Sequence, residues 1–192
     1  FDHDYLRQAV EDRYLSTEEQ RRQAHSELAN WFGNKEEWDE RNAEELPWQL
    51  QEANRLKDLL NILLEPKKLA RIANDRGNRE TICYLLAAKD LAEGRLDELI
   101  AEAVNNEINI IKDNARRLVS FVVQIANILD EAGLHRELLL QLRSLSLNLQ
   151  EGAAVTEQAS LLHSMSLLAK VHRDMGHYDA AENLYLRCLD AR

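Results

Sequence analysis

The sequence predicts an all-α protein whose helical hairpins stack side by side as an α-solenoid. Three observations support this fold class. Glycine and proline number only six and two in 192 residues, too few for the turns that many short strands would need. Apolar residues recur at helical spacing along most of the chain. Toward the C-terminus, single glycines separate the helical stretches, and this alternation of helix and short turn is typical of a solenoid.

The first third of the chain predicts helices over residues 3–14 and 17–31. Ser16 to Glu19 forms a capping-box pattern, in which we expect the Ser16 hydroxyl to accept a hydrogen bond from the Glu19 N–H. Residues 34–45 are dense in carboxylates, so we expect a solvated connection or a frayed helix there. The helical pattern resumes at Pro47, which we place in a first helical turn because its missing N–H would have no partner there.

The rest of the chain predicts a series of helices punctuated by proline and glycine. They cover residues 56–64, 67–72, 79–93, 96–111, 115–132, 134–150, 155–175 and 178–189. Ala87, Ala126 and Ala169 each lie seven residues before a glycine, at Gly94, Gly133 and Gly176. The glycines are 39 and 43 residues apart, which predicts divergent helical-hairpin repeats with a small residue where paired helices approach.

Charge argues against two classes of partner. The formal net charge is −10, and residues 1–65 carry 16 acidic and 8 basic side chains. Binding to nucleic acid or to an anionic membrane surface depends on Lys and Arg, so neither partner is expected. The chain has neither a long uninterrupted apolar run nor a basic region followed by one, so we expect no membrane span and no secretory signal.

The two cysteines predict a reducing compartment. Cys83 and Cys188 each lie among apolar residues of an expected helix, so we interpret them as buried, reduced thiols, which favours a cytoplasmic location. The chain begins at Phe1 without a methionine, and we therefore expect it to be part of a longer protein.

No pattern of residues predicts catalysis, a cofactor or a metal. A phosphate-binding loop needs two glycines five positions apart followed by Lys, and no glycine pair has that spacing. His172 and His177 lie five apart across a helix end, which does not place them on one helical face, so no metal site is expected. We interpret His3 as structural, and Trp31, Trp38 and Trp48 as packing in the core.

The C-terminal residues resemble a known repeat. Gly176-x-Tyr178-x-x-Ala181-x-x-x-Tyr185-x-x-Cys188 resembles the second half of a tetratricopeptide repeat, and Leu168-Ala169 resembles the signature of its first helix. His172 and Met165 depart from the pattern, which favours an aromatic and a Trp at those positions. Spacing above 40 residues is similar to the longer repeats of kinesin light chains and nephrocystin-3. The resemblance implies a tetratricopeptide-like surface for protein binding.

The N-terminal residues resemble part of an ATPase. Phe1 to Val10 resembles the closing helix of the winged-helix region in signal-transducing P-loop ATPases of the NACHT type, and Glu45 to Leu50 is similar to the helical segment that follows it. Together the two resemblances imply the layout of nephrocystin-3-like scaffolding ATPases. Residues 1–33 would end a winged-helix-like module, residues 34–110 would form a helical connector with divergent hairpins, and residues 111–192 would form tetratricopeptide-like repeats.

This layout implies a non-catalytic region that binds proteins and regulates a larger signalling ATPase. Two alternatives stay open: a free-standing tetratricopeptide adaptor and an all-helical hydrolase. First helices of successive hairpins line the groove in such arrays, so the predicted binding residues for a protein or peptide partner are Gln124, Asn127, Ser166, Lys170 and Arg173. Self-association through the open repeat end is a further expectation.

Overall fold

The computed structural model describes residues 3–35, 37–152 and 157–190, and this part of the chain is all-helical. It contains eleven α-helices and one short 3-10 helix, and none of the described residues lies in a strand. The chain divides into two compact units, Phe1–Gly94 and Arg95–Arg192. The boundaries predicted after residues 33 and 110 do not coincide with this division and stay predictions. No helix within the described ranges has the length and apolarity needed to cross a membrane.

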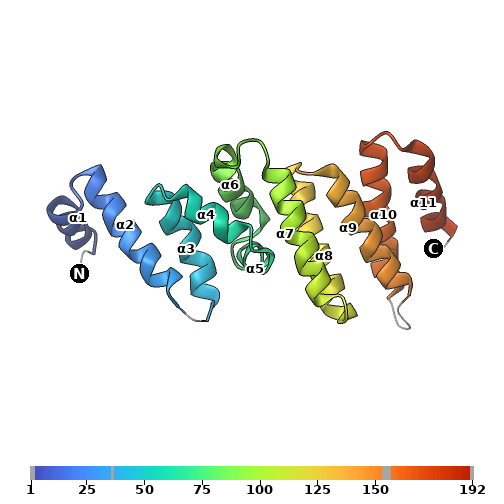
Figure 1. Ribbon diagram of the computed structural model, residues 1–192, viewed down its shortest axis with the longest axis horizontal. Coiled ribbons are helices and arrows are strands. Elements are labelled where there is room, and N and C mark those ends of the chain that lie inside the picture. The colour runs from blue at the N-terminus through green and yellow to red at the C-terminus, as the bar shows by residue number, and fades with distance from the viewer. Residues whose placement is uncertain (1–2, 36, 153–156, 191–192) are drawn as a thin grey trace. The chain divides into compact units, whose positions relative to one another are not determined.

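The first unit is a cluster of α-helices of 8–16 residues and one 3-10 helix. Its elements are α1 (His3–Tyr14), α2 (Glu18–Gly33), α3 (Glu40–Glu52), α4 (Leu56–Leu63), α5 (Pro66–Arg76), α6 (Asn78–Ala88) and the 3-10 helix η1 (Lys89–Ala92). Helix α2 packs against α3, while α4, α5 and α6 pack against α3 and against one another (Figure 1). Leu59, Leu63 and Ile72 are almost completely buried at the centre of this cluster.

The start of helix α2 differs by one residue from the prediction. Thr17, and not Ser16, is the cap: its hydroxyl accepts from the Gln20 N–H at 3.2 Å, and the Gln20 side chain accepts from the Thr17 N–H at 3.1 Å. The sequence contains the capping pattern twice in overlapping registers. The Ser16 hydroxyl instead donates to the Gln20 side chain at 3.0 Å, so both hydroxyls converge on one glutamine.

The expectation of a solvated connection over residues 34–45 is wrong for its second half. Helix α3 begins at Glu40, capped by Asp39, whose carboxylate accepts from the Asn42 N–H at 2.9 Å. This hydrogen bond is the main cause that lowers the pKa of Asp39. Glu40 lies in the first helical turn, where the helix dipole stabilises a carboxylate and offsets part of the repulsion among the acidic residues. Pro47 therefore lies buried inside α3 and not in its first turn.

Two tryptophans and one cysteine are more exposed than predicted. Trp31 and Trp48 are 56% and 41% exposed, so the interpretation as core residues is wrong for both, and Trp38 is half-buried. Trp31 lies edge-on to buried Phe32, which occupies the core position of that turn. Cys83 is exposed, because α6 buries Thr81, Tyr84, Leu85 and Ala88 on its other face.

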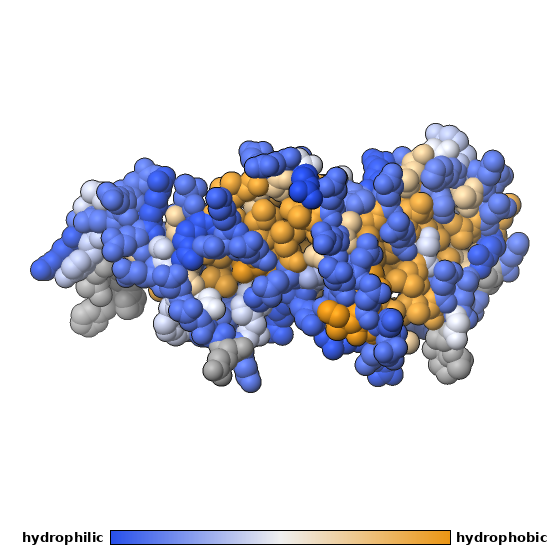
Figure 2. Space-filling view, in the orientation of Figure 1, coloured by the Kyte–Doolittle hydropathy of each residue, from blue (hydrophilic) through white to orange (hydrophobic). Residues whose placement is uncertain are grey.

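Within the described ranges the second unit contains five α-helices of 13–18 residues. They are α7 (Leu96–Ile111), α8 (Ala115–Ala132), α9 (Arg136–Glu151), α10 (Gln158–Asp174) and α11 (Tyr178–Asp190). Each packs against the next one in the chain (Figure 1). Hydrophobic residues are visible among hydrophilic ones over this part of the chain in Figure 2. The predicted helices over this region agree with the structure within a few residues at each end.

The turns at Gly133 and Gly176 share one geometry. Both glycines have positive φ, 64° and 81°. At the first turn the Leu134 N–H donates to the Leu129 carbonyl at 3.0 Å, and at the second the His177 N–H donates to the His172 carbonyl at 2.8 Å. These bonds define a Schellman motif, in which a left-handed residue, here glycine, ends the helix. The prediction of helix ends at both glycines is confirmed.

The small residues before these glycines behave differently in the three predicted repeats. Ala126 and Ala169 are fully buried, as expected where helices pack closely. Ala87 is only half-buried, and its neighbour Ala88 is the buried residue. Helix α6 ends at Ala88 and a 3-10 turn precedes Gly94, so the hairpin predicted around Gly94 lacks the geometry of the other two.

Candidate protein-binding surface

The predicted binding residues lie on two helices of the second unit. Gln124 and Asn127 belong to α8, while Ser166, Lys170 and Arg173 belong to α10. Ser166 and Arg173 are exposed, and the other three are half-buried. The structure therefore separates two outward-facing side chains from three that lie partly within the helix packing.

Asp130 brings part of this set together, although the sequence did not single it out. Its carboxylate accepts hydrogen bonds from Lys170 Nζ at 3.0 and 3.2 Å. Arg143 of α9 places Nη2 3.7 Å from Asp130 Oδ2 and donates from the same nitrogen to Asn127 Oδ1 at 2.9 Å. We call Asn127, Asp130, Arg143 and Lys170 the α8–α10 charge network. It joins three helices through one carboxylate.

Arg143 is the buried member of the network. Its side chain is only 4% exposed, and its Nε has no hydrogen-bond partner among the described residues. Burial lowers the pKa of the Arg143 guanidinium, and the charge of Asp130 works in the opposite direction. Because a buried charge needs a counter-charge, Asp130 is required to hold Arg143 in the packed interior.

The hydrogen bonds that the structure describes for Arg173 are local. Its Nε and Nη2 donate to Asp174 Oδ1 at 3.1 and 3.0 Å, and this hydrogen bond is the main cause that raises the pKa of Arg173. The guanidinium stays about half-exposed. A partner can therefore reach Arg173 without breaking any hydrogen bond between helices that the structure describes.

A hollow of about 200 Å³ lies beside the charge network. It is lined by side chains from the ends of α8 and α10 and from the start of α9. These are Leu129, Asp130, Gly133, Leu134, Arg136, Leu139, Lys170, Val171, Asp174 and Met175. Sites for small ligands usually measure about 300–1,000 Å³, so this hollow suits a single side chain better than a cofactor.

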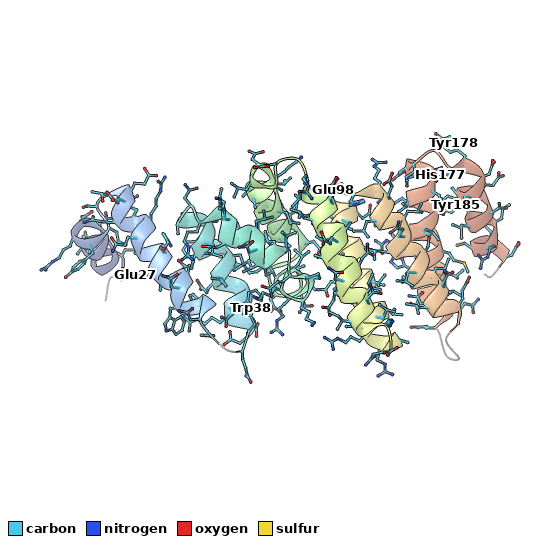
Figure 3. The ribbon with its side chains drawn as sticks, in the orientation of Figure 1. Glu27, Trp38, Glu98, His177, Tyr178 and Tyr185 are labelled. Carbon is cyan, nitrogen blue, oxygen red and sulfur yellow. The ribbon has the colours of Figure 1, made fainter. Side chains whose placement is uncertain are left out.

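Ser166 lines a different hollow, between α10 and α11. The other lining residues are Leu162, Tyr185, Cys188 and Leu189. Tyr185 lies on α11 (Figure 3) and packs against the cluster formed by Leu168 and Ala169. The Cys188 thiol donates to the Leu162 carbonyl at 3.7 Å, which agrees with its predicted packing role.

Metal-ligating side chains do not form a cluster of three or more on the described part of this surface. Within residues 3–35, 37–152 and 157–190, no cluster of three or more His, Cys, Asp or Glu side chains could hold a metal ion. The side chain of His3 lies outside the described set. Self-association through the open repeat end stays a prediction.

Sequence reasoning missed Asp130, Arg143 and the contact between His172 and His177. The first two could not be paired from sequence, because 13 and 40 residues separate Asp130 from Arg143 and Lys170. The histidine contact had a signal: a glycine that ends a helix brings together the residues four before it and one after it.

The comparisons with known proteins identify no relative. No protein-family model, no curated protein and no solved structure matches this chain.

Proposed function

We propose that this chain is a non-catalytic protein-interaction region, built of tetratricopeptide-like hairpins, that acts as a regulatory scaffold of a larger signalling ATPase. The observation that carries the proposal is the ion pair between Lys170 and Asp130. It links α8 and α10, the first helices of two successive hairpins. First helices line the groove in the repeats that the sequence resembles, so this pairing supports a binding surface on α8 and α10.

Packing of the last hairpin also supports the proposal. Ala169 and Ala181 are buried where the repeat pattern has small residues. Leu168 and Leu184 close the core around them, and α10 and α11 meet at the left-handed glycine turn. A hairpin of this kind cannot bury its apolar face alone, which favours an array of several hairpins over an isolated pair.

The partner that best suits this surface is an extended peptide segment. Ser166 and Arg173 lie on the exposed face of α10, and Arg173 keeps N–H groups beyond the two that Asp174 accepts. A guanidinium binds carboxylates with directional hydrogen bonds. We therefore expect the peptide to carry an acidic side chain opposite Arg173.

The contact can be tested by site-directed photo-cross-linking. A photoreactive residue is introduced at Ser166 or at Arg173, and a matched control places it at Gln141, an exposed position on α9. We expect the same cellular protein to be joined at both α10 positions and not at the control. A second arm uses Arg173→Glu with the probe at Ser166, where the cross-linked yield should fall.

The proposed surface would be refuted if the cross-linked yield at Gln141 equalled that at Ser166. It would also be refuted if Arg173→Glu left the yield at Ser166 unchanged. The ATPase part of the proposal is tested separately in the encoding gene. A P-loop encoded upstream of Phe1 supports the scaffold role, whereas a start codon next to Phe1 favours a free-standing adaptor.

A further inference from the structure

The last turn of the second unit brings two histidines into contact. Gly176 ends α10 with a Schellman motif, in which Gly176 N–H donates to the Arg173 carbonyl at 3.0 Å and His177 N–H donates to the His172 carbonyl at 2.8 Å. This motif places the side chains of the residues at both ends of the longer bond next to each other. Here those residues are His172 and His177, and His177 lies at the turn between α10 and α11 (Figure 3).

The two imidazoles face each other through the same nitrogen. Nδ1 of His172 lies 3.4 Å from Nδ1 of His177, and the ring centres are 5.6 Å apart. At the corresponding places of the Gly133 turn the chain has Leu129 and Leu134, the apolar pair that commonly accompanies this motif. The histidine pair therefore stands at the Gly176 turn where the Gly133 turn has an apolar pair.

The separation of the two nitrogens matches a metal geometry. Two nitrogens bound to one tetrahedral Zn²⁺ at about 2.0–2.1 Å lie about 3.3–3.4 Å apart. Two neighbouring ligands at right angles, as in square-planar or octahedral sites, would lie only about 2.9 Å apart at the same bond length. From the 3.4 Å separation across the α10–α11 turn, we propose that His172 and His177 bind a zinc ion through their Nδ1 atoms.

The remaining zinc ligands would come from solvent. A metal ligand must be the neutral imidazole, so zinc binding releases any proton that the pair carries. The described residues offer no third ligating side chain in a cluster with this pair, so water completes the four ligands.

Zinc at this position would join the last turn of α10 to the first turn of α11. His177 precedes Tyr178, the first residue of α11, and its carbonyl accepts the Ala181 N–H at 3.1 Å. Its side chain is therefore tied to α11 through a short stretch of backbone. The ion would act as a cross-link that holds the hairpin closed, and ligands that bind only the folded state raise its stability.

Isothermal titration of the full chain with zinc chloride tests the proposal. We expect one zinc ion per chain in the wild type, and a loss of about tenfold or more in affinity in His172→Gln and in His177→Gln. His163→Gln is the matched control, because His163 is exposed on α10 away from the turn, and its affinity should equal the wild-type value. Melting of the wild type should shift upward with zinc, and melting of the two site variants should not.

Three results would overturn the proposal. The first is the absence of heat and of any melting shift in the wild type, which would leave the pair as a hydrogen bond only. The second is a zinc affinity of the double variant His172→Gln/His177→Gln that equals the wild-type value. The third is zinc binding that Cys83→Ser abolishes, which would assign the ion to the exposed thiol. Far-UV circular dichroism of each variant verifies that its helices are intact.

Discussion

Replacing Asp130 with Asn should destabilise the second unit more than any other single change to the α8–α10 charge network. Asn keeps the shape of the side chain and removes its charge. Arg143, which is 4% exposed, then stays in the interior without a counter-charge. Lys170 loses its ionic partner as well, but it can turn to solvent because it is 44% exposed.

The magnitude follows from the distances. At 3.7 Å and an effective dielectric constant of about 20, the attraction between Asp130 and Arg143 amounts to about 4–5 kcal/mol. Breaking a buried pair on one side costs about 3–5 kcal/mol. Asp130 retains 20% exposure, so water screens part of the loss, and we expect the free energy of unfolding to fall by about 2–4 kcal/mol.

Two comparison variants separate the contributions. Lys170→Met removes a half-exposed charge and should cost only about 0.5–1 kcal/mol. Arg143→Met removes the buried guanidinium together with its unpartnered Nε. It should change stability by less than about 1 kcal/mol, because apolar replacement of a buried ion is often neutral. In the double variant Asp130→Asn/Arg143→Met, most of the loss caused by Asp130→Asn should be recovered.

Native-state hydrogen exchange measures these effects where they arise. The amides of α8, α9 and α10 report the opening free energy of the second unit. The reasoning is refuted if Arg143→Met lowers the protection of these helices as much as Asp130→Asn does. It is also refuted if the double variant Asp130→Asn/Arg143→Met loses as much protection as Asp130→Asn alone. Asp130 would then stabilise the unit through a group other than Arg143.

Two further predictions concern the first unit and the helix ends. A Cβ at Gly77 or at Gly133 would meet no atom within 4 Å, so Ala substitution at either site tests backbone strain alone. Gly77→Ala should cost about 2–3 kcal/mol, because φ 87° and ψ 157° suit glycine only. Gly133→Ala, at φ 64° and ψ 25°, should cost about 1 kcal/mol, and equal losses in urea unfolding would contradict this. Burial, with a hydrogen bond to Glu80, raises the pKa of Tyr84 to about 12. Its contribution to stability is full below the unfolded pKa of about 10 and is lost as pH rises through 12. An absorbance titration should show a late phenolate step that Tyr84→Phe removes, and a step that persists would contradict the assignment.

The fold class and the later helices could be predicted because their signals are local. Gly133 and Gly176 end helices through their own backbone freedom, and apolar spacing gives the helices between them. The start of α3 could not be predicted from composition, because a cap at Asp39 outweighs the repulsion among the following carboxylates. Exposure of Trp31 depends on which neighbour takes the core position, and this is decided by packing.

The candidate site was less predictable from the sequence, because its contacts join residues that are far apart along the chain. Apolar spacing predicts the helices that carry Lys170 and Asn127, but their partners Asp130 and Arg143 come from other turns and another helix. Only tertiary packing brings those groups together. The sequence predicts no contact between His172 and His177, because they do not share a helical face, whereas the Gly176 turn brings their side chains together.

Because of where the tryptophans lie, two optical signals distinguish the two units of the chain. All three indoles, Trp31, Trp38 and Trp48, belong to the first unit, and the second unit has none. Indole fluorescence therefore follows the first unit alone, while the amide signal in circular dichroism follows both. A substitution in either unit can thus be traced to the part of the chain that it affects, without an added label.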